Sequence, residues 1–353
     1  MMGRQRVLAQ VLGAEWRALR AGGRQFDSLP AGEPVGLEEE IACRPALYEE
    51  AQLGRVQCCG FGMSLAGEKA KLDATSFRSV PARRIALGEA VIAGAQVFSG
   101  PSRFFFAQGG IYPALRGRLR EFGAAQLANT AQGMRYFGHW LRDDCVMRDL
   151  MAEGGAVLSM VRPHWPDAVA YERLFGQGWD EVSLAYVSDL TVWRELGFSR
   201  DKARRIRDLR ARLRQGVVGH GAGRVVYIAR GPGGAPRTME NEDALLAALD
   251  AAGVMILRPE GNAEALLNEL LDASLVISIE GSQLTHAVFS LAEGGGVLTI
   301  QPPDRFYNPH HEWTRLMGMR YGIVVGQPGE GGFTVDAGEV LAMIDRLMAA
   351  REG

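Results

Sequence analysis

The sequence has few cysteines, and their spacing is not that of a disulfide framework or of a zinc site. Its 353 residues contain four cysteines, at positions 43, 58, 59 and 145, and no two of them form a C-x-x-C pair. Neither a disulfide framework nor a zinc site is therefore expected. The simplest interpretation is a reducing, cytoplasmic compartment, peripheral to the inner membrane face if the first helix contacts lipid.

Long apolar segments and net charge are also lacking. No run reaches about 18 apolar residues, and the first residues hold no apolar core of a signal peptide. The formal net charge is −2, so the chain as a whole is not expected to bind nucleic acid. Lysine occurs only at positions 69, 71 and 202, and arginine supplies the other basic side chains. Guanidinium groups suit phosphates and carboxylates.

The length predicts two domains, and the two halves of the chain differ in regularity. We expect an N-terminal domain over residues 1–215 and a C-terminal domain over residues 223–353. In the first half, residues 83–113 contain short β-type runs broken by glycine and proline, which indicate hairpins. The chain turns helical near Tyr136, and residues 155–161 are typical of a short strand.

In the C-terminal half, strands alternate with helices. This alternation predicts a parallel sheet with helices on both faces, a Rossmann-like α/β domain. The expected strands are 224–229, 254–258, 275–279, 297–301 and 321–325, and the expected helices are 241–252, 263–272, 282–292, 309–317 and 337–350. Ligands of such sheets bind outside the carboxyl ends of the strands. The loops that follow the strands are therefore the first places to search for a site.

A basic amphipathic helix is predicted at the start of the chain. Residues 4–20 place Leu8, Leu12, Trp16 and Leu19 at helical spacing, with several arginines between them. Such a helix usually docks on its own domain, and less often it lies on an anionic membrane surface. Peripheral membrane contact through this helix therefore stays open.

A second basic helix is predicted over residues 198–216. Ser199 is a suitable N-cap, and apolar residues recur at helical spacing along one face. The other face is rich in arginine. Such a face is most often solvated, and we expect that here rather than contact with nucleic acid or a membrane.

The loop after the first strand of the C-terminal half is a candidate anion site. Arg230 and Arg237 are separated by a glycine-rich arc, and Asn241 is placed to cap the next helix. Two arginines above a helix start form a plausible diphosphate clamp. The loop is neither a G-x-G-x-x-G fingerprint nor a P-loop, and a surface loop whose arginines pair with nearby acids is an equally good interpretation.

The second candidate is the stretch "IEGSQLTH", where a strand passes through Gly281 into a helix that begins at Ser282. A helix start presents free N–H groups to an anion. Glu280 conflicts with a phosphate there, because like charges ~5 Å apart repel by about 3 kcal/mol at an effective dielectric of ~20. Its carboxylate is therefore expected to face sugar hydroxyls or an arginine. Thr285 and His286 lie on the first turn, and His286 is by default a half-buried packing residue.

The third candidate is "YFGHWLRDD", in which His139 and Asp143 lie one helical turn apart. A carboxylate beside an imidazole serves as a general base in many enzymes. The pair could also hold a metal, but the sequence offers no evident third ligand. An exposed ion pair is the simpler interpretation. The loop "QPPDRFYNPHHEW" (301–313) mixes aromatics and histidines at the ligand edge, where a base or sugar could stack.

Three of these blocks together resemble glycosyltransferase family 61. "IARGPGGAPRTMENEDAL" resembles its Arg…Arg…Asn-Glu block, "DASLVISIEGSQLTHAVF" its His-Gly-Ala-x-Leu-Thr-Asn block, and "YFGHWLRDDCVMRDLM" its His-Trp-Leu-x-Asp helix. The blocks occur in the family's order over about 136–303. The resemblance implies a GT-B-like pair of Rossmann-like domains, with the N-terminal one less regular and on the acceptor side. It also implies a bacterial capsular-polysaccharide type of enzyme without an obligatory metal.

The resemblance assigns roles to individual residues. It places Arg230 and Arg237 on the donor diphosphate together with Asn241. From the second block it brings Gly281, Ser282, Thr285 and His286 to the nucleotide sugar. His139 and Asp143 match the third block, and Asp143 is the first choice for the base that deprotonates an acceptor hydroxyl.

The sequence also departs from the family pattern. Glu280 replaces the usual histidine before glycine, and His286 replaces the usual asparagine after threonine. The Leu-Pro-Arg-Leu continuation after the third block is absent. Glu280 therefore joins the candidate catalytic residues as a site where donor recognition or activity differs.

The expected function is that of an inverting hexosyl- or pentosyltransferase. It moves a sugar from a nucleotide donor, most often UDP-linked, to a glycan or glycolipid in surface polysaccharide biosynthesis. A non-catalytic GT-B-like protein that binds nucleotide or glycan is the alternative. A pyruvyl-type transferase on the same architecture is a third interpretation.

Overall fold

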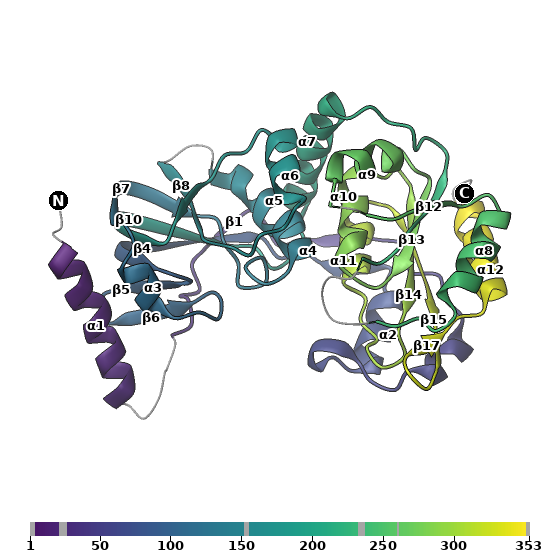
Figure 1. Ribbon diagram of the computed structural model, residues 1–353, viewed down its shortest axis with the longest axis horizontal. Helices are drawn as coiled ribbons and strands as arrows, with labels where there is room; N and C mark the ends of the chain where they lie inside the picture. Colours follow the sequence, from purple (N-terminus) through teal and green to yellow (C-terminus); the bar gives the residue numbers. More distant parts are fainter. Residues whose placement is uncertain (1–3, 21–26, 152–154, 232–236, 260, 351–353) are drawn as a thin grey trace. The chain divides into compact units, whose positions relative to one another are not determined.

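The computed structural model describes residues 4–20, 27–151, 155–231, 237–259 and 261–350 of a mixed α/β protein (Figure 1). Its residues form two compact units. Unit 1 comprises Met1–Leu37, Val80–Ala168 and Gly176–Gly197, and unit 2 comprises Glu38–Ser79, Val169–Phe175 and Phe198–Gly353. The helix predicted over 198–216 lies in unit 2.

Unit 2 is built on a parallel sheet in the order β12-β11-β13-β14-β15. The strands are β11 (Val225–Ile228), β12 (Met255–Leu257), β13 (Leu275–Ile279), β14 (Gly296–Gln301) and β15 (Arg320–Val325). Most residues of these strands are buried, because helices cover both faces of the sheet. The exceptions are β12, whose residues are half-buried, and Val225, the first residue of β11. The predicted strands of the C-terminal half are confirmed to within about two residues.

Helices flank this sheet on both sides in Figure 1. One side carries α8 (Glu242–Ala251) and α12 (Ala337–Ala349), and the other carries α9 (Ala263–Leu270), α10 (His286–Ser290) and α11 (Pro309–Leu316). The core under α8 and α12 joins Leu245, Leu249, Val340 and Leu347 to Ile277 on the central strand. The predicted Rossmann-like architecture of this half is confirmed at the level of a helix-covered parallel sheet.

The strand order creates a switch point between β11 and β13. From β11 the chain crosses through α8 to β12 on one side, and it returns through α9 to β13 on the other side. The loops that leave the carboxyl ends of β11 and β13 therefore run in opposite directions, and ligands of such sheets bind between loops of this kind. Arg230 and Glu280 stand at these two strand ends.

The helix predicted over 282–292 differs from the expectation. Residues Ser282–Thr285 form a 3-10 turn, and α10 continues only from His286 to Ser290. The α-helical dipole that begins at Ser282 is therefore much weaker than a helix of eleven residues would give. An anion at this strand end has to be held mainly by side chains.

The remaining elements of unit 2 surround the sheet. They are β2 (Glu40–Ala42), α2 (Leu65–Asp73), β3 (Ser76–Arg78), α7 (Arg200–Gly216), β16 (Gln327–Pro328), β17 (Phe333–Thr334) and nearly all of α6 (Ala168–Phe175). Ser199 caps α7 as predicted, its hydroxyl accepting from the Lys202 N–H at 3.1 Å.

The arginine-rich face of α7 corrects another expectation. Lys202, Arg205 and Arg210 are at most 2% exposed, whereas Arg204 and Arg207 face solvent. Arg210 donates from Nη1 to the Val288 carbonyl at 2.7 Å and from Nη2 to the Leu291 carbonyl. Three of the eight basic side chains of α7 are thus buried, and one of them, Arg210, satisfies carbonyls at the end of α10.

Unit 1 contains a mixed sheet in the order β6-β5-β4-β10-β7-β8-β9, with β1 also paired to β4. The strands are β1 (Glu33–Val35), β4 (Ala82–Ala93), β5 (Gln96–Ser99), β6 (Ser102–Phe105), β7 (Arg120–Leu127), β8 (Ala156–Met160), β9 (Asp180–Val182) and β10 (Leu184–Arg194). The antiparallel β4-β5-β6 part confirms the predicted hairpins, and β10-β7-β8-β9 are parallel.

Helices of unit 1 include α1 (Arg4–Arg20), α3 (Ile111–Leu115), α4 (Phe137–His139) and α5 (Cys145–Arg148). A π-helical turn, Trp140–Asp144, joins α4 to α5. The core of the sheet is formed by apolar side chains such as Ile92, Leu127 and Val187. Across the described part of the chain, no helix combines the length and apolar character needed to span a bilayer.

Candidate functional site

The strand ends of unit 2 bring an arginine onto the acid that the sequence analysis found out of place. A terminal nitrogen of Arg237 (Nη2) lies 2.5 Å from Oε2 of Glu280, and the two side chains are only 8% and 6% exposed. This confirms the expectation that the Glu280 carboxylate faces an arginine. The negative charge of Glu280, which would repel an anion at the switch point, is therefore neutralised by Arg237 of the same unit.

Arg230 is held at the same place from the end of β11. Its Nη1 donates to the Glu280 carbonyl at 3.3 Å and lies 3.4 Å from Oε1 of Gln283. The Gln283 amide in turn donates to the Ser278 hydroxyl at 3.0 Å, and that hydroxyl donates to the Ile228 carbonyl at 2.6 Å. A short chain of hydrogen bonds thus ties the end of β11 to the end of β13 and positions Arg230 across the switch point.

Three arginines act on one carboxylate here. Burial raises the pKa of Glu280, and Arg237, Arg305 and Arg230 oppose that shift. Burial, together with the charges of Arg237 and Arg305, lowers the pKa of Arg230 to about 10. Three guanidinium groups and one carboxylate carry a formal charge of 3 − 1 = +2. A ligand with about two negative charges would neutralise this cluster, which we call the strand-end cluster.

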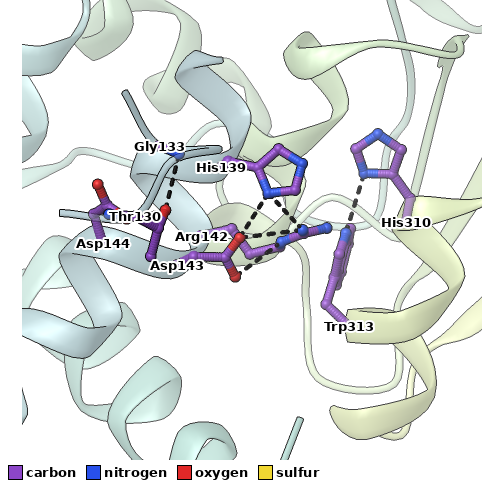
Figure 2. A network of polar contacts seen from close by, with 8 residues as sticks. All are labelled: Thr130, Gly133, His139, Arg142, Asp143, Asp144, His310 and Trp313. Carbon is purple, nitrogen blue, oxygen red and sulfur yellow. Dashed lines mark hydrogen bonds and ion pairs between the residues drawn. The ribbon is translucent and has the colours of Figure 1, made fainter. Parts of the chain in front are cut away.

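Gly281 lets Arg230 approach the backbone. A Cβ at this position would lie 2.3 Å from Arg230 Nη1 and 2.4 Å from Gln283 Oε1. The Gly281 carbonyl also faces His310, whose Nε2 lies 3.0 Å away. Figure 2 shows His310 against Trp313, whose indole N–H donates to His310 Nδ1 at 3.1 Å. Because Nδ1 accepts that bond, Nε2 carries the ring proton and donates to Gly281.

Two of the predicted ligand-binding residues have their side chains turned into the fold. His286 is 3% exposed, and its Nδ1 is hydrogen-bonded to the Tyr171 hydroxyl at 2.6 Å. Burial lowers the pKa of His286 to about 4, so the ring is neutral. Thr285 is 2% exposed. His286 is therefore fully buried rather than the half-buried residue that the sequence predicted.

Asn241 stands at the N-cap position of α8, but its side chain does not cap the helix. Its amide instead donates to the Val335 carbonyl at 2.8 Å, and its Oδ1 accepts from the Val335 N–H at 3.0 Å. The expected capping is wrong, because both ends of the Asn241 side-chain amide are hydrogen-bonded to the backbone of Val335 and not to the first turn of α8. Ser282, by contrast, remains half-buried at the strand end.

In unit 1, His139 and Asp143 form the predicted pair, shown in Figure 2. His139 Nδ1 lies 2.8 Å from Asp143 Oδ2, and Arg142 Nη2 lies 3.2 Å from the same oxygen. The Asp143 side chain is 8% exposed and that of His139 is 27% exposed. The pair is thus not the fully exposed ion pair of the simpler interpretation. Asp143 orients the imidazole, and Nε2 of His139 is the ring nitrogen that points away from this contact.

A second carboxylate on this turn was not singled out from the sequence. Asp144 is fully buried, and its Oδ1 accepts from the Thr130 hydroxyl at 2.7 Å and from the Thr130 N–H at 3.2 Å. Burial raises the pKa of Asp144 well above its usual range. A Cβ on Gly133 would lie 2.1 Å from Asp144 Oδ2, so only glycine leaves room for this carboxyl group. Asp144 anchors the π-helical turn that carries Asp143.

Sequence reasoning missed Arg305, which belongs to the strand-end cluster, and Gln283, which contacts Arg230. Arg305 follows β14, and its guanidinium lies 4.8 Å from the ring centre of Phe61. The signal was available, because the loop 301–313 was placed at the ligand edge, but only its aromatics and histidines were weighed there. Among residues in the described ranges, no three His, Cys, Asp or Glu side chains converge to hold a metal ion.

Unit 2 therefore has the strand order of doubly wound α/β proteins, whose ligands bind at the switch point of the parallel sheet. One family model matches a part of the chain that includes this switch point. The model of the family Glycosyltransferase 61 matches residues 137–298, a segment that runs from α4 to β14 and contains both the His139–Asp143 pair and the Arg230–Glu280 region. This match supports glycosyltransferase family 61 and suggests glycosyltransferase activity. A comparison with curated proteins gives no match.

Proposed function

We propose that this protein is an inverting glycosyltransferase that uses a nucleotide-sugar donor, UDP-linked in the first instance, and a glycan or glycolipid acceptor. The observation that carries the proposal is the strand-end cluster. Its formal charge of +2 at the switch point of a doubly wound sheet matches the charge of a nucleotide diphosphate group. The family match over the same segment supports a sugar as the group that the diphosphate carries.

The donor diphosphate is assigned to Arg230, Arg237 and Arg305. Charge-assisted hydrogen bonds from guanidinium groups to phosphate are short and strong, and the buried position of Arg237 makes them stronger. When the diphosphate leaves, its developing charge is stabilised by the same groups. Glu280 is a counter-ion that holds Arg237 in place until the donor competes for it.

The proton acceptor is assigned to His139, with Asp143 as its positioning residue. The family resemblance favours Asp143 as the base. However, Asp143 is engaged by His139 and by Arg142, and its side chain is the less exposed of the pair, 8% against 27% for His139. A carboxylate in this position orients an imidazole and stabilises its protonated form.

The proposed step conserves atoms and charge. The acceptor hydroxyl oxygen forms a bond to the anomeric carbon, and its proton passes to Nε2 of His139. The bond between the anomeric carbon and the diphosphate oxygen breaks, and its electron pair leaves with the diphosphate. Displacement from the face opposite the leaving group inverts the anomeric configuration.

A donor screen tests the proposal directly. Purified protein is incubated with UDP- and GDP-sugars, and binding is followed by calorimetry while nucleotide release reports turnover or hydrolysis. We expect one donor class to bind and to be consumed. Arg230→Ala should weaken donor binding by at least about tenfold, since hydrogen bonds to charged groups contribute about 1.5–3 kcal/mol.

Arg258→Ala is the matched control, because Arg258 is exposed just after β12, at the same edge of the sheet but away from the switch point. His139→Gln should lower turnover by about 10²–10⁴-fold with little change in donor affinity. His164→Gln replaces an exposed histidine of the same unit and should change neither. Absence of nucleotide binding to the parent protein would exclude the proposal, and binding without turnover by any donor and acceptor would leave only a binding protein.

A further inference from the structure

One helix of unit 1 carries an exposed surface that the proposed reaction does not use. The inner face of α1 packs on the sheet through Val7, Val11 and Ala14, which are at most 5% exposed. The buried Glu15 of the same helix pairs with the buried Arg103, with 2.7 Å between Oε1 and Nη2. This helix is therefore anchored in the core of unit 1, and its outer face has a fixed orientation.

The outer face of α1 exposes large apolar side chains. Leu12 and Trp16, one helical turn apart, are 45% and 57% exposed. Exposed aromatic side chains also occur on the two elements that contact α1, namely Tyr112 on α3 at 55% and Phe105 on β6 at 38%. Apolar side chains gathered on neighbouring elements are typical of a surface that meets an apolar partner.

The charges around this surface are mostly positive, although the exposed Asp27 accepts from the Arg103 N–H on β6 at 2.7 Å. In residues 4–20 and 90–120 the sequence contains a single acidic residue, Glu15, which is buried against Arg103. The arginines that are exposed on α1 and just after α3 are Arg4, Arg17, Arg20, Arg116 and Arg118.

Two contacts connect these arginines to the apolar surface. Arg4 donates to the Leu115 carbonyl at 2.6 Å and to the Gly117 carbonyl at 3.0 Å, which brings the start of α1 onto the loop of Arg116 and Arg118. The Arg20 guanidinium lies 3.7 Å above the Trp16 ring. The apolar side chains are thus flanked by positive charge at both ends of the helix.

We propose that the outer face of α1, with the loop after α3, docks this protein on an anionic phospholipid bilayer. Tryptophan and leucine on a helix that lies flat enter the headgroup boundary, while arginines contact anionic headgroups. A symmetric contact between two copies would bring the same arginines together and is disfavoured by repulsion. The proposal does not depend on the proposed reaction, because neither the strand-end cluster nor His139 takes part.

Vesicle sedimentation tests the docking surface. Purified full-length protein is mixed with vesicles of phosphatidylcholine alone or of phosphatidylcholine with phosphatidylglycerol, at low and at high salt. We expect binding to the anionic vesicles, weakened by salt. Arg17→Gln/Arg20→Gln should bind about 25-fold less tightly, because each arginine near an anionic surface contributes about fivefold. Trp16→Ala should bind about tenfold less tightly or worse.

Control variants test whether vesicle binding depends on the outer face of α1 or on any exposed arginine or apolar side chain. Arg204→Gln/Arg207→Gln removes two exposed arginines from α7, and Leu196→Gln removes an apolar side chain of unit 1 that is 60% exposed. Both should bind like the parent. All substituted side chains are exposed, and thermal unfolding checks that each variant folds.

A spectroscopic signal gives an independent readout. Tryptophan emission should shift to shorter wavelength on anionic vesicles, and Trp16→Phe should abolish the shift while retaining most of the binding. The proposal is overturned if anionic vesicles do not bind the parent, or if the control variants lose as much affinity as the α1 variants. It is also overturned if the α1 variants change RNA binding or oligomeric state, measured by light scattering, rather than vesicle binding.

Discussion

Two groups of arginines in unit 2 are both largely withdrawn from water, yet they are satisfied in different ways. Arg210 on α7 donates to carbonyls at the end of α10, and burial lowers its pKa to about 10. At the strand ends, burial and the charges of Arg237 and Arg305 lower the pKa of Arg230 to the same value, as Arg214 does for Arg210. The two groups differ in their acceptors, because Arg210 donates to two backbone carbonyls whereas Arg237 pairs with the buried Glu280 carboxylate.

The acceptor of a buried guanidinium distinguishes a structural arginine from a ligand-binding one. A buried guanidinium that donates to backbone carbonyls stabilises the fold, because it replaces the water those carbonyls would otherwise need. Guanidinium groups that repel one another around one carboxylate reduce stability in the absence of a ligand, and an anion removes the repulsion. Sequence alone does not distinguish the two, since both sets are arginines beside apolar residues.

The largest effect should come from breaking the Arg237–Glu280 pair. Arg237→Ala leaves the Glu280 carboxylate buried without its partner, and we expect a loss of about 3–5 kcal/mol in the free energy of unfolding. Denaturation in urea measures this loss, and calorimetry with UDP measures the accompanying loss of donor affinity.

The double variant Arg237→Ala/Glu280→Gln separates the two roles. It should recover most of the lost stability, because the buried charge is gone, but it should not recover UDP affinity. If the double variant binds UDP as tightly as the parent, Arg237 only neutralises Glu280 and is a structural arginine that does not bind the ligand.

Removing a structural arginine should destabilise the fold without affecting the ligand. Arg210→Ala leaves the Val288 carbonyl at the end of α10 without its side-chain donor and the Leu291 carbonyl with only that of Arg214, and we expect a loss of about 2–4 kcal/mol. UDP affinity should stay that of the parent protein. Arg204→Ala on the same helix serves as control, because Arg204 is 62% exposed and surface pairs contribute roughly 0–1 kcal/mol.

Much of unit 2 could be predicted from its sequence, because each element carries its own signal. Alternating apolar strands and amphipathic helices define the parallel sheet, and the rule that ligands bind at strand carboxyl ends led to Arg230, Arg237 and Glu280. The repulsion estimate left sugar hydroxyls or an arginine as partners of Glu280, and the structure shows Arg237 there. The relative arrangement of two such domains remains a prediction.

What could not be predicted depends on contacts between distant residues. His286 is buried against Tyr171, which lies far earlier in the chain, and Asn241 fails to cap α8 because Val335 pairs with its amide. Arg305 joins Arg230 only once the sheet order places β14 beside β13. The mixed sheet of unit 1 was harder still, because β4 and β10 are paired across about a hundred residues.

His286 allows a smaller effect to be measured, one that depends on pH. Its pKa is lowered to about 4 in the fold against 6.5 when unfolded, so folding favours the neutral ring. The stability that this ring contributes is present above about pH 6.5 and is lost as the pH falls towards 4. We expect a loss of about 2–3 kcal/mol over that window.

The variant His286→Asn should flatten this pH dependence, because asparagine offers the Tyr171 hydroxyl an acceptor but does not titrate. His311 has its pKa lowered to about 4 by burial as well, and it should supply a residual slope. Urea unfolding at pH 7 and pH 4.5 gives the values. If His286→Asn instead changes UDP affinity at pH 7, the residue belongs with the ligand-binding group after all.

The smallest change that still distinguishes the two groups is one methyl group at the switch point. In Gly281→Ala the new Cβ would lie 2.3 Å from Arg230 Nη1, and the flexible guanidinium has to move away from the strand end. We expect UDP affinity to fall about tenfold while stability changes by less than about 1 kcal/mol, because Arg230 can relax towards solvent. Gly231→Ala is the control, since no described atom lies within 4 Å of a Cβ there. Equal UDP affinities for the two variants would mean that the position of Arg230 against Gly281 does not matter to the ligand, and the strand-end cluster would lose the arginine that bridges β11 and β13.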